Sequence, residues 1–228
     1  EPASATGQWA VGSGDPTPIT EWIGVTLQKN EEVSKIHWTY SGLSGSINLQ
    51  WLPPTVITCC AYVNNLEGSL DLTALPDPLL DLNMSKNAFS GGISLEHLPN
   101  TFLDLDLSTN KLSGTVNLEH LPPHLQNLFL HNNAFDGTLC LTKLPKTLQV
   151  LSLGRNSFVG KIDLTALPEK LQELFVNSNA LTGSTDFSKL PEALMTICVS
   201  RTKLKGAIFA TQRMNVKAID SEVKVYGL

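Results

Sequence analysis

Carboxylates at equivalent points of consecutive segments are the first residues in this chain that could do chemistry. Asp81 and Asp104 occupy the same place in two successive segments of similar sequence, and Asp106 follows close behind. Three carboxylates in one patch can hold a cation. The surrounding residues lack the regular Asp spacing and the glycine of a dedicated calcium loop. We therefore expect a solvated or partner-facing acidic patch, and no metal site.

Histidines suggest a second metal hypothesis. Two Glu-His pairs recur at the same interval as the two aspartates, with another histidine nearby: Glu96-His97, Glu119-His120 and His124. Stacked segments could bring two imidazoles close enough to share a transition metal. The equivalent position of the next segment is Lys143, so we expect these polar residues to form a solvated wall. We expect no metal and no cofactor.

Nucleophilic chemistry has little support. Serine, histidine and aspartate occur without a motif that would place them together, and the chain has neither a phosphate-binding loop nor a CxxC pair. The sequence therefore predicts a protein that is not an enzyme. The four cysteines are expected to stay reduced, which favours an intracellular location over a secreted or cell-surface one. They are Cys59, Cys60, Cys140 and Cys198.

Bulk composition excludes several classes of protein. The 228 residues are 42% hydrophobic, enough for a continuous core, and the formal charge of -5 does not suit nucleic-acid binding. No apolar run is long enough for a membrane-spanning helix. The chain begins at Glu1, which fits a processed product or an excised fragment. We expect one elongated domain that is monomeric in isolation.

A strict internal repeat must position all of these residues. Leu-Pro pairs recur at one fixed 23-residue interval, and a glycine keeps the same period from Gly45 to Gly206. A fixed period of this length predicts a solenoid, in which each repeat forms one coil stacked on the last. The pairs are Leu52-Pro53, Leu75-Pro76, Leu98-Pro99, Leu121-Pro122, Leu144-Pro145, Leu167-Pro168 and Leu190-Pro191.

One repeat, residues 79–101, shows how a coil is built. Leu82 and Met84 alternate with polar residues, which is the period of a half-buried strand. Asn87 stands where the chain must turn, and a buried Asn there can satisfy backbone groups that the turn leaves unpaired. The repeat predicts one strand per coil in a parallel sheet. The strands are expected near 35–39, 58–62, 81–85, 104–108, 127–131, 150–154, 173–177 and 196–200.

The repeat pattern LxxLxLxxNxFxGxIxLxxLPxx resembles the leucine-rich repeat (LRR) family over residues 22–208. Its GxIxL half resembles the plant-type subclass, although this repeat is one residue shorter than the usual plant repeat. Its LPxxL spacing resembles protist repeats. The resemblance implies a right-handed α/β-type LRR solenoid, mostly β with little helix, and an eight-strand parallel sheet on the concave face. One domain, residues 1–228, would comprise an N-terminal cap (1–32), eight repeats (33–208) and a C-terminal cap (209–228).

The N-terminal cap departs from the plant pattern. Residues 22–26 resemble the cap of plant LRR receptors, but Leu27 replaces the cysteine of that family. The cap disulfide of the plant receptors is therefore not expected in this chain.

The resemblance also implies where a partner would bind. Outward strand residues have no core role, and aromatic anchors with a polar surround are typical of protein-binding surfaces. We expect a non-catalytic module that binds a protein partner through the concave face; alternatives are a secreted or cell-surface domain recognising a peptide or glycan, and a structural subunit of a larger assembly. The predicted binding residues are Tyr62, Asp81, Asp104, Asp106, Phe129, His131, Arg155, Phe175, Asn177 and Arg201.

Overall fold

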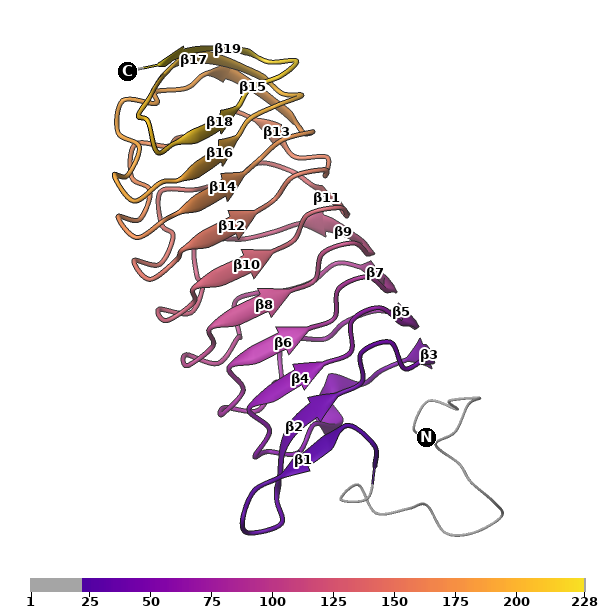
Figure 1. The fold of residues 1–228 in the computed structure, drawn as a ribbon. Helices are drawn as coiled ribbons and strands as arrows, with labels where there is room; N and C mark the ends of the chain where they lie inside the picture. The colour runs from indigo at the N-terminus through magenta and orange to yellow at the C-terminus, as the bar shows by residue number, and fades with distance from the viewer. Residues whose placement is uncertain (1–21, 228) are drawn as a thin grey trace.

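The computed structural model describes residues 22–227, which form one curved stack of coils (Figure 1). The coil is right-handed and almost entirely β, as the repeat predicted. In the described residues the helical elements comprise a short 3-10 turn, η2 (Leu49–Trp51). No helix in this part of the chain has the length and hydropathy needed to cross a bilayer.

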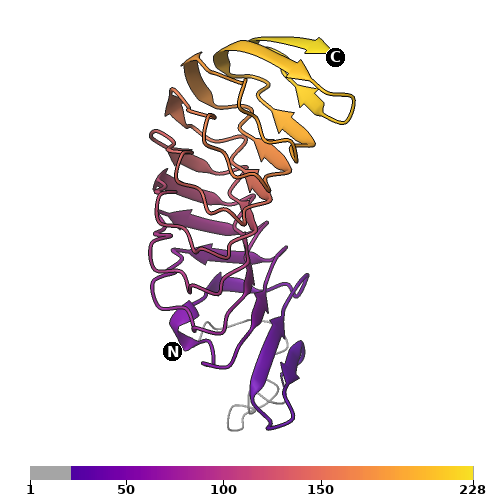
Figure 2. The same cartoon turned by 90° about the vertical axis from the view of Figure 1, so that its left-hand side faces the viewer.

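A ten-stranded sheet runs along the concave side of the stack (Figure 2). All pairings from β2 to β18 are parallel, whereas β1 pairs antiparallel with β2. From β4 to β16, equivalent residues of successive repeats pair in register, so that Leu105 lies beside Leu128. The strands are β1 (Val25–Leu27), β2 (Val33–His37), β4 (Thr58–Cys60), β6 (Asp81–Asn83), β8 (Asp104–Asp106), β10 (Asn127–Phe129), β12 (Val150–Ser152), β14 (Glu173–Phe175), β16 (Thr196–Cys198) and β18 (Asn215–Lys217).

Shorter parallel sheets line an adjoining side of the stack. One has five strands and the other four, each strand following the turn after a concave strand. The Leu-Pro segments then close each coil through turns without strands, because proline has no N–H to donate to a sheet. The strands are β3 (Ser44–Ser46), β5 (Asn65–Gly68), β7 (Ala88–Gly91), β9 (Lys111–Thr115), β11 (Ala134–Asp136), β13 (Val159–Gly160), β15 (Ala180–Ser184), β17 (Lys203–Ala210) and β19 (Glu222–Gly227).

The core is one continuous column inside the coils. Leu105 and Leu107 are fully buried, as the alternation in their strand predicted. Phenylalanines in or directly before the second strands are fully buried, and the rings of Phe135 and Phe158 stack with centroids 6.4 Å apart. Burial of each such side chain contributes roughly 1.5–3 kcal/mol. Stability therefore accumulates coil by coil, as expected for a repeat protein.

The corner after each concave strand combines a strained residue with an asparagine. Lys86, for example, has a left-handed φ of 53° and immediately precedes Asn87. The Asn87 side chain donates to the carbonyls of Ala61 and Met84, and its Oδ1 accepts from the amide of Leu66. The same pattern recurs through Asn179. The predicted asparagine ladder is present and links each coil to the preceding one.

The prediction of eight strands is wrong, since the concave sheet has ten. Residues placed in the caps extend it at both ends: β1 folds back on β2, and β18 adds a further coil with Val216 in the inward row. The strands are also shorter than expected for most repeats, because the chain begins to bend toward the left-handed corner. The first part of the predicted N-terminal cap, residues 1–21, lies outside the described residues.

Candidate partner-binding surface

The concave sheet presents two parallel rows of outward side chains. The strand-start row contains Asp81 and Asp104, which are direct partners in adjacent strands. The strand-end row runs across seven neighbouring strands in register. It contains Cys60, Asn83, Asp106, Phe129, Ser152, Phe175 and Cys198. The structure therefore gathers the predicted carboxylates and both phenylalanines on one face.

The acidic patch consists of Asp81, Asp104 and Asp106, all half-buried. Asn127 donates its side-chain amide to Asp104, and the backbone amide of Ser108 donates to Asp106 at 2.9 Å. None of the ion pairs within residues 22–227 includes these carboxylates. Burial raises the pKa of the Asp81 carboxyl, and the negative charge of Asp104 raises it further. The patch thus holds negative charge that no salt bridge neutralises within the part of the chain that the structure describes.

The aromatic half of the surface lies directly beside this patch. Phe129 pairs with Asp106 on one side and with Ser152 on the other, and Phe175 follows Ser152. Both phenylalanines are half-buried, whereas Ser152 is only 6% exposed. A short side chain therefore separates two rings in the same row.

His131 supports the phenylalanine row from the side. Its Nδ1 lies 3.1 Å from Ser152 Oγ, and its ring meets Phe129 edge to face with centroids 6.4 Å apart. Burial lowers the pKa of His131, with Asp106 opposing this effect and Arg155 adding to it. Sequence periodicity placed His131 on the face but gave no signal for the contact with Ser152.

The remaining predicted residues lie toward the corner of the coil. Asn177 leans over Gly154, since a Cβ on that glycine would stand 2.5 Å from its Oδ1. Tyr62 packs edge to face against Tyr40.

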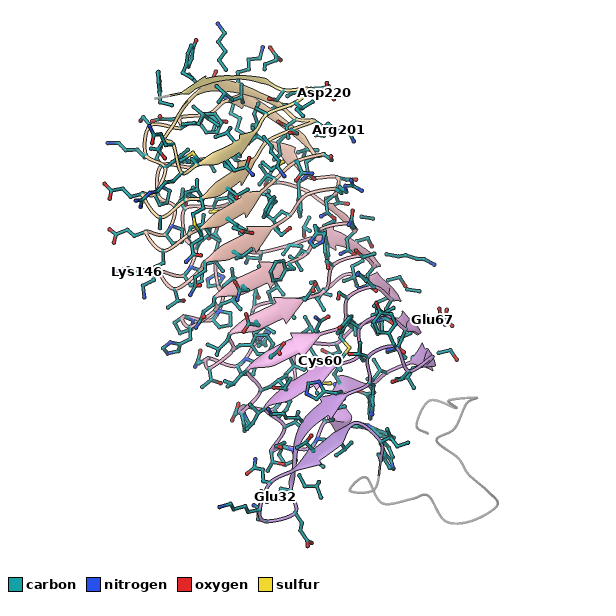
Figure 3. All side chains as sticks on the ribbon, in the orientation of Figure 1. Glu32, Cys60, Glu67, Lys146, Arg201 and Asp220 are labelled. Carbon is teal, nitrogen blue, oxygen red and sulfur yellow. The ribbon has the colours of Figure 1, made fainter. Side chains whose placement is uncertain are left out.

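Two of the predicted residues occupy the corner itself. Arg155 and Arg201 have left-handed φ values of 56° and 54° and are exposed at the corner, outside the strands. Arg201 Nε lies 3.8 Å from Asp220 Oδ2, and Figure 3 shows the two side by side. These two arginines therefore lie beside the sheet face and do not belong to either row of outward strand residues.

Cys60 is more buried than its outward strand position suggested. It is 9% exposed, in the strand-end row between His37 and Asn83 (Figure 3). Burial raises its pKa to about 11, and Asp81 contributes to the increase. Cys59 faces the core, as predicted, and burial raises its pKa as well. Both thiols are therefore packed among the side chains of the sheet.

Among the described residues, neither the aspartates nor the Glu-His pairs form a group that could bind one metal ion. Across residues 22–227, no three His, Cys, Asp or Glu side chains are grouped where one metal ion could bind them. On the outer wall, Glu119 pairs with Lys143 at 2.5 Å, and His120 Nδ1 lies 3.4 Å from the Asn117 side chain. The Glu-His pairs thus take part in local polar contacts of that wall.

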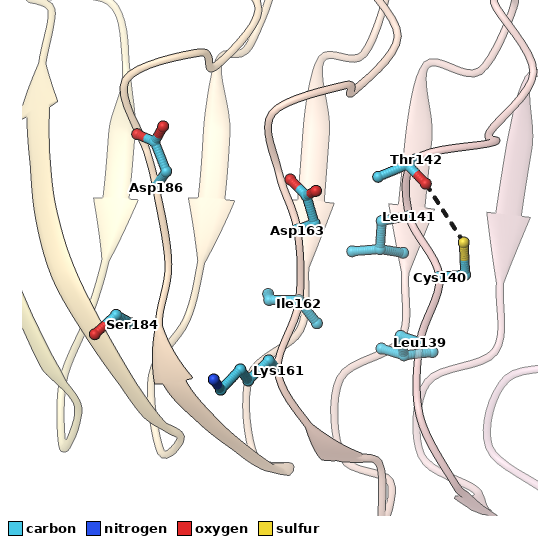
Figure 4. Close-up of a pocket in the computed structure, with 9 residues that line it drawn as sticks. All are labelled: Leu139, Cys140, Leu141, Thr142, Lys161, Ile162, Asp163, Ser184 and Asp186. Carbon is cyan, nitrogen blue, oxygen red and sulfur yellow. Dashed lines mark hydrogen bonds between the residues drawn. The ribbon is translucent and has the colours of Figure 1, made fainter.

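An open depression of about 530 Å³ lies between coils away from the concave face (Figure 4). Asp163 and Asp186 line it, but each carboxylate already accepts from a backbone amide two residues on, at 2.8 Å. The hydroxyl and then the amide of Thr165 lower the pKa of the Asp163 carboxyl, and the Ser188 amide lowers the pKa of the Asp186 carboxyl. Cys140 lies at the equivalent position one coil earlier and contacts Thr142 Oγ1 at 3.5 Å. The polar side chains that line the depression therefore stabilise turns within their own coils.

Comparison with known proteins supports the fold. No protein-family model and no curated protein matches the chain. Among solved structures, Pollen Receptor Kinase 3 aligns with a TM-score of 0.56 at 29% identity, over 72% of this chain and 82% of that one. The LRR ectodomain of the Arabidopsis thaliana receptor kinase GASSHO1/SCHENGEN3 aligns with a TM-score of 0.63 at 19% identity. The Arabidopsis receptor kinase HAESA aligns with a TM-score of 0.58 at 21% identity.

The extent of these matches differs. The chain is matched over 83% of its length by GASSHO1/SCHENGEN3 and 89% by HAESA, but it spans only 24% and 44% of those chains. The shared feature is the stack of coils with a parallel concave sheet. In its repeat, its asparagine ladder and its solenoid, the chain has the fold of leucine-rich repeat proteins.

Proposed function

We propose that the chain is a non-catalytic module that binds a protein partner through the concave face of the solenoid. One observation carries the proposal: two half-buried phenylalanines stand in register beside an acidic patch that forms no salt bridge among the described residues. Aromatic side chains supply most of the binding energy at many interfaces, while charged groups at the edge favour one orientation of the partner.

The comparisons support a protein partner. The GASSHO1/SCHENGEN3 ectodomain was crystallised in complex with CASPARIAN STRIP INTEGRITY FACTOR 2, and HAESA with the peptide hormone IDA and the co-receptor SERK1. Because the chain spans less than half of either protein, their partners are not transferred to it. From these neighbours we take only the general function. One copy of the chain would present its concave sheet to a polypeptide.

Opposed charges at different points along the face would orient the partner. The acidic patch lies on β6 and β8, whereas Arg155 and Arg201 flank the face farther toward the C-terminus. Asp220 weakens the field of Arg201, so we assign Arg155 the larger share. Exposed charges of this kind alter the association rate and the orientation more than the affinity.

The test is capture of partners from the source cells, followed by measurement of affinity. The double variant Phe129→Ala/Phe175→Ala should weaken binding of a captured protein at least ~10-fold, since hot-spot truncations cost about 2 kcal/mol or more. Its melting temperature should change little, because both rings are half-buried at the surface.

The matched control removes two aromatic rings elsewhere. Phe209 and Tyr226 stack at 5.2 Å near the C-terminal end of the solenoid and are 61% and 46% exposed. Phe209→Ala/Tyr226→Ala should leave binding unchanged. If this control abolished binding while Phe129→Ala/Phe175→Ala did not, the concave face would be rejected. A captured glycan would instead favour the alternative of a glycan-recognition domain.

A further inference from the structure

The C-terminal end of the solenoid is built differently from the N-terminal end. At the N-terminal end, β1 folds back and pairs antiparallel with β2. At the C-terminal end, β18 and β19 instead continue the parallel stack, beside β16 and β17 (Figure 1). They are the last strands of their sheets in the described part of the chain. Because a solenoid buries each coil against the next, this last coil needs a cover.

Apolar side chains of this last coil are accessible to solvent. Ile197 is 0% exposed, whereas Val216, its direct partner in β18, is only partly buried. Ile208 is likewise 0% exposed, whereas Val225, its direct partner in β19, is 45% exposed. The equivalent positions of earlier coils form the core. Another layer of protein against this end would therefore bury apolar surface, which is favourable.

The strand β19 also presents a free backbone edge. It pairs with β17 over six consecutive positions, from Glu222 to Gly227, without a shift in register. Sheets commonly protect their edges with prolines, bulges or very short strands. The edge strand β19 contains no proline, and its pairing with β17 contains no bulge. Its outer N–H and C=O groups can therefore pair with an incoming strand.

The charges of β19 select the strand that fits. Glu222 and Lys224 are both exposed and lie two residues apart, on the same face of the strand. Opposite charges directly across a strand pair stabilise it, and like charges destabilise it. If β19 pairs antiparallel with its own copy around Val223, each Glu222 faces a Lys224. Pairing around Lys224 would instead oppose two lysines.

An ion pair within the chain does not prevent this contact. Glu222 Oε2 lies 3.0 Å from Lys205 Nζ, and both side chains are more than half exposed. A carboxylate has two oxygens with about four acceptor positions, so Glu222 can accept from a second ammonium group. The strand is therefore self-complementary in this one register.

We propose that the C-terminal end is a homodimer interface, in which β19 pairs antiparallel with β19 of a second copy around a two-fold axis at Val223. The two four-stranded sheets join into one, and the Glu222–Lys224 pair forms twice. The contact uses the same surface on both copies, so it closes at two. The concave face stays free in each copy. This state differs from the monomer that the sequence suggested.

The experiment is sedimentation equilibrium of the 228-residue chain at micromolar concentrations, where a dimer has twice the mass of the 24.7 kDa chain. Glu222→Lys and Lys224→Glu each turn two attractive pairs into two repulsive ones. Either change should weaken the dimer at least ~10-fold. The double variant Glu222→Lys/Lys224→Glu restores opposite charges across the pair and should recover the dimer.

Matched controls make the same changes in charge away from the end. Glu169→Lys and Lys170→Glu alter exposed residues of the Leu-Pro wall. Each should change the dissociation constant of the dimer less than about twofold, since separated surface charges are screened. Melting temperatures of all variants would show that the exposed substitutions leave the fold intact.

A disulfide would test the register directly. Residues directly opposite in an antiparallel pair have Cα atoms about 4.5–5.5 Å apart, within the range of a disulfide. In a Cys140→Ser background, Val223→Cys should therefore form an intermolecular disulfide under mild oxidation. Val225→Cys should not, because its two copies would lie four residues apart along the paired strands, roughly 13 Å.

Three outcomes would overturn the inference. The first is a chain that stays monomeric at its highest soluble concentration. The second is a dimer that both charge reversals leave intact, which would place the contact on another surface. The third is protection of the β19 amides from hydrogen exchange only in complex with a different protein, which would assign the edge to that protein. None of the three bears on the proposed concave binding face.

Discussion

Asn133 reaches back to Leu107 in the preceding coil, donating its side-chain amide to the Leu107 carbonyl at 3.0 Å. The same amide donates to the Leu130 carbonyl at 3.1 Å, and its Oδ1 accepts from the backbone amide of Leu112 at 3.0 Å. One side chain therefore satisfies groups of two coils. It stands directly after Asn132, whose left-handed φ of 55° would otherwise favour opening of the corner.

Removal of this side chain should destabilise the solenoid. Asn133→Ala leaves the Leu112 amide without its acceptor, and a buried unsatisfied group costs about 1–3 kcal/mol. It also removes one of the two side-chain donors to each carbonyl, since Asn110 and Asn156 keep donating to Leu107 and Leu130. Asn100→Ala is the control, since Asn100 is exposed on the Leu-Pro wall. Urea denaturation should give a lower midpoint for Asn133→Ala than for Asn100→Ala. Equal midpoints would contradict the ladder.

The sequence predicted those features of the fold that recur in every coil. Leu105 and Leu107 show their inward position by alternation, and Asn110 shows its corner by its place in the period. The ends could not be read in this way. Asn215, Val216 and Lys217 form β18 without a Leu-Pro pair or a ladder asparagine, so the 23-residue period does not mark this strand.

The candidate site was predictable as a face but not as a set of contacts. Alternation placed Phe129 and Phe175 in one row, because the row follows from the backbone. The burial of Cys60 and the contact of His131 with Ser152 depend on side chains from neighbouring coils. Such contacts are set by packing between repeats, which the pattern within one repeat does not specify.

Gly24 should be essential to the attachment of β1. Its φ is +84°, and a Cβ there would lie 2.2 Å from the His37 carbonyl oxygen. The backbone amide of His37 also donates to the Gly24 carbonyl at 2.7 Å. Gly24→Ala should therefore cost roughly 1–3 kcal/mol beyond the strain of the left-handed conformation, as overpacking does.

Gly42 is the matched control for this substitution. Its φ is +65°, but nothing lies within 4 Å of an added Cβ. Gly42→Ala should show only the conformational strain, about 1 kcal/mol. Limited proteolysis of the 25–37 region and urea denaturation would compare the two variants. Equal protection of that region in both would show that the close approach of Gly24 to His37 is unimportant.

The four thiols should differ sharply in reactivity. Cys140 is partly exposed, whereas Cys59, Cys60 and Cys198 are buried. Because the thiolate is the reactive form, the pKa of about 11 for Cys60 keeps nearly all of this thiol protonated and unreactive at pH 8. Iodoacetamide should alkylate Cys140 first in the native protein, as peptide mass spectrometry would show, and all four at similar rates in urea. Faster native labelling of Cys60, or an intramolecular disulfide, would refute these assignments.

Neutralising Asp81 should stabilise the chain at neutral pH. The charged carboxylate is disfavoured in the folded protein by burial and by Asp104, which raise its pKa above the unfolded value near 3.9. A carboxyl with a raised folded pKa destabilises the native state above that pKa, and this penalty disappears below the unfolded pKa. Asp81→Asn should therefore raise the free energy of unfolding at pH 7, by about 0.2–1 kcal/mol for a cross-strand like-charge pair.

The pH dependence distinguishes this effect from a gain in packing. The difference between Asp81→Asn and the unmodified chain should shrink as the pH falls and vanish near pH 3, where both side chains are neutral. Asp77→Asn, the same change at an exposed position on the Leu-Pro wall, should have little effect at either pH. A stabilisation by Asp81→Asn that persisted unchanged at pH 3 would mean that it does not arise from the charge. The opposed carboxylates of Asp81 and Asp104 would then carry no cost to folding.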